Sequence, residues 1–539
     1  MNIIRVEPQT VAQVSFDPSN IEVTRSGVPN YYWPIRLQEL MESARSIVAA
    51  YREALAGPLR EGDVEARLAY TVTSLIFMEL QGMFAAKLLA ARCRHDGIQP
   101  QLPASAAPEL RAEFFGEDHD YWIVKVLRGG VRRPRKWRRL VRPLGDIVRP
   151  DFFRRRSIET ANMESDTITV TPCDLTRKHA RKLGIRPTYV PLYEWFYPPT
   201  PEELRESPLK SVSPTIRNRL LETLEDTFLS LGAARLDMRR EIIGELIDET
   251  TAWARFYLER IRQRPERLPR RLWIGSSGVI WSRILAEAVH MNGGEVVGHD
   301  HAHGANYSED TLIPFNELQA KDVFVTYTQA HADLYRRVGP KLQIGPTMPQ
   351  VEHVGTAEKR EPAKAAMPAL EPHTVLYVPS ILTTGRVGAM PQMPPIMAYD
   401  WQARLITTLQ ELGLEVTQKP HPQSPVPQAP VFEREFGVET AHGRFEDIMD
   451  RYDVLLFDFA PQTCFGSALR SSMPIVLIDF GITTYKSDFG AMLQKRCAIV
   501  PGRFDEDNRA QIDPGALAHA IGRARFLNDT SFADAVIAL

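Results

Sequence analysis

The chain has 539 residues, of which 44% are hydrophobic and 24% are charged, and its formal net charge is −2. This length exceeds one ordinary hydrophobic core, so the sequence predicts more than one domain, and the composition excludes a disordered or fibrous protein. The small net charge gives no chain-wide attraction to nucleic acid or to an anionic membrane. Four widely spaced cysteines without a CxxC pair argue against a zinc ribbon or a disulfide framework, and they favour a reducing compartment.

Residues 1–120 are predicted to form a helical N-terminal region. Apolar residues recur at helical spacing over 34–55 and 63–92. The most apolar part, 75–91, carries charged and amide side chains, which fit a buried helix better than a membrane span. Because the first residues lack an apolar signal core, we expect a cytoplasmic protein, and we also consider contact with the inner face of the cytoplasmic membrane.

Residues 125–156 form a basic segment in which only Asp146 and Asp151 oppose the cations. Such a segment suits contact with anionic lipid headgroups or an acidic glycan, since each basic residue near an anionic membrane contributes about 1 kcal/mol. A solvated loop whose arginines pair with acids elsewhere explains the segment equally well. Nucleic acid is not the expected partner.

A regular alternation of strands and helices begins at Arg271 and predicts a parallel sheet. We expect this sheet to be the centre of an N-terminal Rossmann-like domain over 121–345, which would hold the acceptor. The predicted strands are 271–276, 295–298 and 322–327, and the predicted helices are 279–292 and 329–338.

The stretch 339–372 is rich in proline, lysine and glycine and is the predicted hinge. The alternation then repeats, so we expect a C-terminal Rossmann-like domain over 346–539, which would hold a nucleotide donor. The predicted fold class is therefore α/β, with two Rossmann-like domains facing a cleft and an extra helical N-terminal region. The strands expected in the second domain are 374–379, 415–419, 454–458, 475–479 and 498–501.

The loop after the strand 295–298 concentrates titratable side chains, and we call residues 299–307 the histidine loop. A histidine beside a carboxylate suits general base work near neutral pH. The HxHxH spacing also leaves a metal site open, but no acidic partner motif follows, and we expect no metal. Gly304 permits a tight turn. The titratable residues of this loop are His299, Asp300, His301 and His303.

A second loop follows the strand 415–419 and reads Lys419-Pro420-His421-Pro422. The two prolines end the strand and place the imidazole at its carboxyl edge, where open α/β sheets bind ligands. Lys419 and His421 are therefore candidate donors to a phosphate. A proline-rich loop with no ligand is the alternative.

A third loop, 457–467, lies at the end of the next predicted strand, 454–458. Its strand ends at Asp458, and Thr463 and Ser467 lie at the start of a predicted helix, where hydroxyls and free N–H groups suit an anion. Asp458 is also explained as a helix cap or turn residue. No P-loop, GxGxxG, GxSxG or HExxH motif occurs in a supporting context, so P-loop NTPases, dinucleotide dehydrogenases, α/β-hydrolases and zincins are not the leading hypotheses.

The order of these motifs resembles that of GT-B glycosyltransferases of bacterial surface-polysaccharide synthesis. This group includes capsule Kdo transferases, sialyltransferases and CDP-glycerol glycerophosphotransferases of teichoic acid synthesis. The matching elements are His303-Gly304, His421-Pro422 and the strand end from Asp458 to Ser467. The resemblance covers roughly residues 271–526.

This resemblance implies roles for the candidate residues. His421, with Thr463 and Ser467, would contact the phosphate of a cytidine nucleotide, and Lys419 and Asp458 are assigned to the same site. The base that activates the acceptor hydroxyl would be His303, as in the glycerophosphotransferases, or Asp300, as in the sialyltransferase-like members. Gly304 and Asn306 would shape the turn that meets the acceptor.

The sequence thus predicts a metal-independent glycosyltransferase that needs no cofactor beyond its nucleotide-sugar substrate. It would move a sugar from a CMP- or CDP-linked donor to a bacterial surface polysaccharide or glycolipid, an anionic acceptor. A CDP-glycerol-type glycerophosphotransferase, a GT-B-like nucleotide-sugar epimerase and a non-catalytic assembly scaffold are the alternatives.

Overall fold

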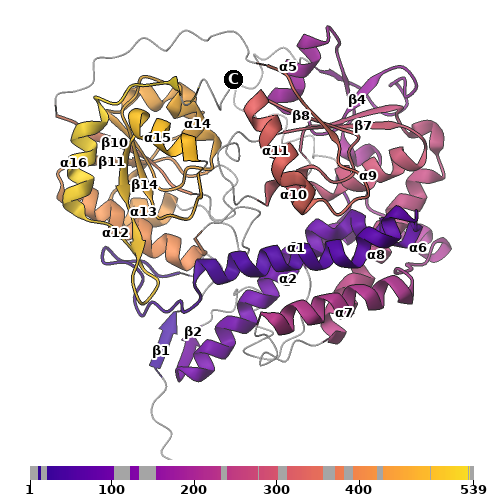
Figure 1. The fold of residues 1–539 in the computed structure, drawn as a ribbon, viewed down its shortest axis with the longest axis horizontal. Helices are drawn as coiled ribbons and strands as arrows, with labels where there is room; N and C mark the ends of the chain where they lie inside the picture. Colours follow the sequence, from indigo (N-terminus) through magenta and orange to yellow (C-terminus); the bar gives the residue numbers. More distant parts are fainter. Residues whose placement is uncertain are drawn as a thin grey trace, which may run out of the picture.

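The computed structural model describes residues 10–13, 21–101, 122–132, 153–231, 240–276, 278–300, 312–355, 371–380, 393–421, 429–485, 487–531 and 533. Two parallel β-sheets, each with its own helices, stand above a layer of long helices (Figure 1). The predicted α/β class with two Rossmann-like domains and a helical N-terminal region is confirmed. The cleft between the domains stays a prediction, because the loops 301–311, 381–392 and 422–428 lie outside the described residues.

The sheet of the first domain has seven strands in the order β3-β5-β4-β6-β7-β8-β9, and every pair is parallel. The direction of strand addition reverses between β4 and β6, which makes their carboxyl ends the switch point of this sheet. The strands are β3 Arg154–Arg155, β4 Thr167–Thr169, β5 Thr188–Tyr189, β6 Arg271–Ile274, β7 Glu295–His299, β8 Val323–Thr326 and β9 Gln350–His353.

The predicted domain boundary at 345 and the predicted hinge over 339–372 both need correction. The helix α11 (Gln329–Leu342) continues through Gly339, and β9 pairs with β8 in the first sheet, with Val351 opposite Phe324. The first sheet therefore extends to His353. The proline and glycine content of this stretch marks tight connections within the domain, and only 356–370 remains between the two sheets as undescribed chain.

Helices cover both faces of the first sheet, and its main core joins apolar residues of β6 and β7 to α9 and to the N-terminal helices. Most of the basic segment 125–156 lies outside the described residues, so its predicted partner stays untested. The helices are α4 Trp122–Gly129, α5 Asp174–Lys182, α6 Pro201–Glu206, α7 Pro214–Ser230, α8 Arg240–Arg262, α9 Ile280–Met291 and α10 Ile313–Glu317, in addition to α11.

The sheet of the second domain has six parallel strands in the order β12-β11-β10-β13-β14-β15. Its switch point lies between β10 and β13. One core joins the sheet to α12 (Pro395–Glu411), α13 (Ala429–Phe436) and α16 (Pro514–Ala524), and a separate core joins it to α14 (Thr463–Leu469) and α15 (Ser487–Arg496). The strands are β10 Thr374–Val378, β11 Glu415–Gln418, β12 Glu439–Thr440, β13 Val454–Phe457, β14 Ile475–Asp479 and β15 Ala498–Pro501, followed by the hairpin β16 Arg503–Phe504 and β17 Ala510–Gln511.

The helices α1 (Leu37–Arg60) and α2 (Val64–His95) belong to both domains. Leu40 near the start of α1 packs in the core of the second domain, whereas Tyr51 one half-helix later packs in the core of the first domain. In α2 the order is reversed, with Phe77 in the first core and Leu89 in the second. Figure 1 shows α1 running beneath both domains. The N-terminal region is thus a shared structural layer.

No single helix within the described ranges is long and apolar enough to cross a membrane, while the two parts of α2, Val64–Ser74 and Ile76–His95, meet at a 56° bend and pass that test only as a pair.

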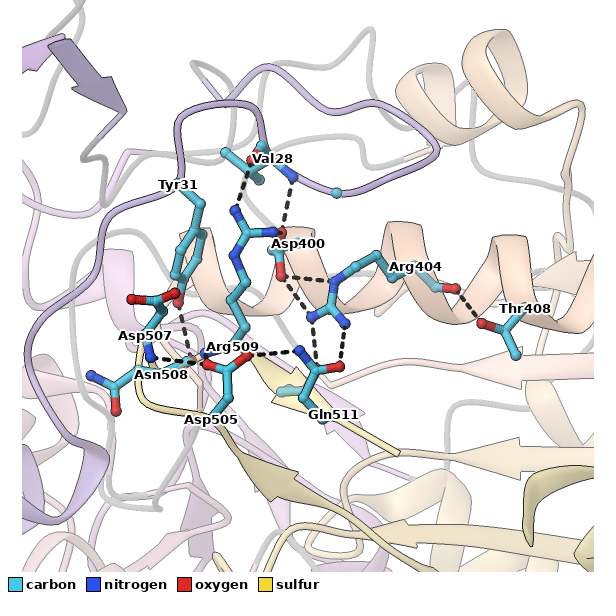
Figure 2. A network of polar contacts seen from close by, with 12 residues as sticks. Val28, Tyr31, Asp400, Arg404, Thr408, Asp505, Asp507, Asn508, Arg509 and Gln511 are labelled. Atoms are coloured by element: carbon cyan, nitrogen blue, oxygen red, sulfur yellow. Dashed lines mark hydrogen bonds and ion pairs between the residues drawn. The ribbon is translucent and has the colours of Figure 1, made fainter. Parts of the chain in front are cut away.

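The segment 21–36 lies on the second domain as a strap, held by a buried carboxylate (Figure 2). Asp400 is fully buried, and its Oδ1 accepts a hydrogen bond from the Val28 amide at 3.0 Å while its Oδ2 accepts one from the Arg404 guanidinium at 2.7 Å. Arg509 lies 3.3 Å from the same carboxylate. Gly27 has a φ of +104°, and a Cβ there would lie 2.3 Å from Asp400 Oδ1, so only glycine fits this approach. The strap fixes the start of α1 to the second domain.

Candidate functional site

The carboxyl ends of the strands form one edge on each sheet, and the predicted site residues that the structure describes lie in or next to these edges. We call the residues that follow β4, β6, β7 and β8 the first edge, and those that follow β10, β11, β13 and β14 the second edge. Ligands of open α/β sheets bind at such edges, next to the switch point. The first edge comprises 170–173, 275–276, the last residue of β7 with 300, and 327–331, and the second edge comprises 379–380, 419–421, 458–463 and 480–484.

At the second edge, Lys419 and His421 leave the end of β11 as predicted. The Lys419 amide donates to the Tyr377 carbonyl at 2.8 Å, which keeps the backbone in register with β10 up to the first proline. Both side chains are partly buried. Among the described residues, no carboxylate pairs with the Lys419 ammonium. Burial, followed by the charge of Lys419, lowers the pKa of His421 below its usual value, so the imidazole is neutral at pH 7.

The start of α14 comes close to Lys419. Thr463 is exposed as the first residue of this helix, and Gln462 ties the preceding loop to β10 by donating to the Val378 carbonyl at 3.3 Å. Burial, then Glu446, raises the pKa of the Cys464 thiol to about 11, while the Lys419 charge lowers it. The Lys419 charge therefore acts on the first turn of α14, and we call Lys419, His421 and Thr463 the donor cluster.

Asp458 does not take the role predicted for it. Its carboxylate is buried and accepts three hydrogen bonds: a short one from the Tyr377 hydroxyl, one from Trp401 Nε1 at 3.1 Å and one from the Ser380 amide at 3.0 Å. Burial raises the pKa of this carboxyl despite these bonds. Asp458 therefore joins β10, β13 and α12 beneath the edge, and it is not placed to contact a phosphate.

Ser467 is also engaged elsewhere. It lies in the second turn of α14, where its hydroxyl hydrogen-bonds the Glu446 carboxylate at 2.9 Å. A carboxylate beside this hydroxyl disfavours a phosphate at the same position. Of the three residues predicted on this loop, only Thr463 is exposed, and it belongs to the donor cluster with Lys419 and His421.

At the first edge, His299 is a buried structural residue. Its Nδ1 lies 3.3 Å from the Ile274 carbonyl, so this nitrogen carries the proton, and its Nε2 accepts from His179 Nδ1 at 3.0 Å. The His179 ring stacks on Trp273 with centroids 4.6 Å apart. Burial lowers the pKa of His299 to about 3 and that of His179 to about 4. Both rings are neutral at pH 7, which keeps this arrangement intact.

Asp300 is buried as well, next to a partner that the sequence did not single out. Its amide donates to the Val325 carbonyl at 2.9 Å, and its Oδ2 lies 3.0 Å from His331 Nδ1. His331 is fully buried in the first turn of α11, whose cap is Thr328. Because this carboxylate is buried and paired with His331, Asp300 as arranged here is not an accessible base.

The remaining residues of the histidine loop lie outside the described residues: His301, His303, Gly304 and Asn306. Within the described part of the chain, no group of three histidine, cysteine or acidic side chains is placed to hold a metal ion.

The switch point of the first edge contains a contact that sequence reading missed. The Thr171 hydroxyl oxygen accepts hydrogen bonds from the Gly275 and Ser276 amides, both at 3.1 Å. A Cβ on Gly275 would lie 2.0 Å from the Thr171 carbonyl oxygen. The backbone segments that follow β4 and β6 are therefore in direct contact, and they leave no space for a ligand between them. The glycine in the strand 271–276 was the available signal, because an isolated glycine at a strand end marks a close backbone approach.

No family model matches the chain, and no curated protein matches it. Among solved structures, the chain is similar to a GtfA/B complex, with 14% sequence identity and a TM-score of 0.32, over 52% of this chain and 57% of that chain. It is also similar to the pneumococcal O-GlcNAc transferase GtfA in complex with UDP and GlcNAc, with 14% identity and a TM-score of 0.33, over 53% of this chain and 56% of that chain. The chain thus spans little more than half the length of either structure, and a likeness at this level does not bear on its chemistry.

Proposed function

We propose that the chain is a glycosyltransferase that binds a nucleotide-activated sugar at the second edge and transfers the sugar to a bacterial surface polysaccharide or glycolipid. The nucleotide we propose is CMP or CDP, and no metal or further cofactor takes part. The support is the presence of two Rossmann-like domains together with a donor cluster at the edge of the second one.

The observation that carries this proposal is the position of Lys419. Its ammonium has no carboxylate partner among the described residues, it is partly buried, and it lies beside His421 and the start of α14. A cation held in this way at the carboxyl edge of a parallel sheet, on the strand next to β10, suits a phosphate, and charge-assisted hydrogen bonds to phosphate are about twice as strong as neutral ones. In the transfer step the same cation would stabilise the nucleotide as it leaves with its negative charge.

We assign the proton transfer from the acceptor hydroxyl to His303 and give Asp300 a positioning role. The support is the burial of Asp300 and its 3.0 Å contact with His331, which leave no path for an acceptor hydroxyl to this carboxylate. Asp300 begins the loop that carries His303, so fixing Asp300 to α11 fixes the origin of that loop.

A donor screen by mass spectrometry tests the reaction. The purified protein is mixed with CMP-, CDP-, UDP- and GDP-linked sugars, with CDP-glycerol and with an anionic glycan acceptor. We expect sugar transfer from a cytidine-linked donor, abolished in His303→Ala. Glycerol phosphate transfer would identify the glycerophosphotransferase instead, donor conversion without acceptor would identify the epimerase, and the absence of nucleotide binding would leave the assembly scaffold.

We also propose that the protein works in the cytoplasm, with the basic segment 125–156 in peripheral contact with the inner membrane surface. The support is the cationic composition of this segment. Flotation with vesicles that contain anionic lipid should carry the protein upward at low salt and not at high salt. Failure to float at low salt would remove the membrane contact without affecting the transferase proposal.

A further inference from the structure

One face of α1 lines two adjacent grooves. The first groove, of about 730 Å³, lies between the start of α1 and second-domain residues that include Phe480 and Thr484 of the second edge. The second groove, of about 770 Å³, lies between the rest of α1 and first-domain residues that include Leu312 and Lys341. Arg45 lines both grooves. The two grooves are therefore neighbours along α1.

The spacing along the helix explains why one face serves both grooves. Side chains three or four positions apart lie above one another on a helix. The opposite face of α1 is buried in the two cores, through residues such as Leu40, Ile47 and Tyr51. The lining residues follow this spacing over six turns: Leu37, Gln38, Met41, Arg45, Val48, Ala49, Arg52, Ala56 and Arg60.

The second groove is strongly cationic, although the chain as a whole has a charge of −2. Its charged lining residues are Arg45, Arg52, Arg60 and Lys341, against Glu53 alone. Arg52, Arg60 and Lys341 are exposed, and among the described residues none of the three pairs with a carboxylate. Arg52 instead donates to the Lys341 carbonyl at 3.1 Å, which holds its guanidinium at the wall of the groove. Charge complementarity therefore predicts an anionic occupant.

The shape of the groove narrows the choice of occupant. Its floor consists of small or apolar residues of α1, among them Val48, Ala49 and Gly57, and its far wall includes Leu312 and Leu342. A recess between one helix and a domain suits a chain-like ligand better than the broad face of a bilayer. Leu312 is also the first described residue after 301–311, the segment that contains His303. The groove is thus lined by a residue that follows the histidine loop closely in sequence.

We propose that the second groove binds the acceptor as a polyanionic oligosaccharide, with Arg52, Arg60 and Lys341 contacting its carboxylates. The identification of the ligand as the acceptor rests on the proposed transferase function, whereas the binding of an acidic saccharide does not. The apolar floor carries the sugar rings, and the cations select for negative charge along the chain.

Calorimetry with hexagalacturonate, a carboxylated hexasaccharide, tests this site without any donor. We expect wild-type binding that weakens steeply with salt, and a loss of affinity of at least about tenfold in Arg52→Glu/Lys341→Glu. Arg219→Glu is the matched control, because Arg219 is an exposed arginine on α7 without an ion-pair partner among the described residues. Its affinity should equal that of the wild type. Arg52→Gln/Lys341→Gln, which removes charge without repulsion, should show an intermediate loss.

Nucleotide titrations of the same proteins separate this proposal from the proposed function. If Arg52→Glu/Lys341→Glu binds cytidine nucleotides as the wild type does but no longer binds hexagalacturonate, the groove proposal and the transferase proposal both stand. If no nucleotide binds but hexagalacturonate binding still depends on Arg52 and Lys341, the groove stands and the transferase proposal falls. Wild-type protein that fails to bind the saccharide overturns the groove. The groove proposal is also overturned if Arg52→Glu/Lys341→Glu binds hexagalacturonate as tightly as the wild type does, or if this variant loses affinity only for anionic vesicles.

Discussion

At the first edge, the titratable side chains His299, Asp300 and His331 are fully buried, whereas at the second edge Lys419 and His421 are partly accessible and Thr463 is exposed. The first set is paired internally, His299 with His179 and Asp300 with His331. The second set holds a lysine without a carboxylate partner among the described residues. The comparison separates two uses of polar residues at a strand end, because buried pairs fix the shape of an edge and accessible donors bind ligands.

Acidification is expected to have the largest effect, and it acts on the first edge. The folded-state pKa values of about 3 for His299 and about 4 for His179 lie below the ordinary value of 6.5, so the unfolded chain binds protons more readily. This stability is fully present above pH 6.5 and is lost as the pH falls, by about 1.4 kcal/mol per pH unit for each histidine. Urea unfolding at pH 7, 6 and 5 measures the slope. A free energy of unfolding that does not fall over this range contradicts the buried neutral pair.

Breaking the Asp300–His331 pair should have the next largest effect. Asp300→Ala leaves a buried imidazole without its partner, which we expect to lower the free energy of unfolding by about 3 kcal/mol. Asp333→Ala is the control on α11, because Asp333 and its partner Arg336 are both exposed, and the loss there should be below about 1 kcal/mol. Equal losses in the two variants would show that the burial of Asp300 contributes nothing.

Asp458 tests whether the second edge also has a buried supporting layer. Asp458→Ala leaves the Tyr377 hydroxyl, Trp401 Nε1 and the Ser380 amide without their acceptor, and we expect a loss of about 2 kcal/mol in the free energy of unfolding. The exposed Asp450, replaced by alanine, should show no change beyond about 0.5 kcal/mol. Nucleotide affinity at a temperature where the variant is folded should stay within about threefold of wild type, and a larger loss would return Asp458 to the binding site.

The alternation of strands and helices was enough to predict most of the second domain. In each β–α unit the spacing of apolar residues identifies the strand and the helix, and turn-forming residues mark where each of them ends. β14 was predicted with its observed bounds, and β11 and β13 within one residue of theirs. The segment predicted as a short helix at 445–452 is instead two 3-10 turns, Phe445–Asp447 and Met449–Arg451. Strands of two residues, such as β3 and β5, are too short to show an alternation of apolar and polar residues, so the sequence did not predict them.

The site was only partly predictable for a different reason. A strand end identifies which residues reach the edge, and the sequence predicted the observed positions of Lys419 and His421 after β11 and of Thr463 at the start of α14, whereas their role in binding stays a prediction. It does not identify what packs against them. Asp458 accepts a hydrogen bond from Trp401, 57 positions earlier, and Asp300 contacts His331 on α11. Local sequence patterns do not encode these tertiary contacts.

The most direct test of the account is a calorimetric titration of CMP and CDP into wild type, Lys419→Ala and Lys495→Ala. Lys495 is an exposed lysine near the end of α15 and serves as the matched control. We predict that Lys419→Ala lowers the affinity by about tenfold or more, the size expected for one charge-assisted hydrogen bond to phosphate, and that Lys495→Ala leaves it unchanged. If Lys419→Ala binds either nucleotide as tightly as wild type, the second edge is not the nucleotide site.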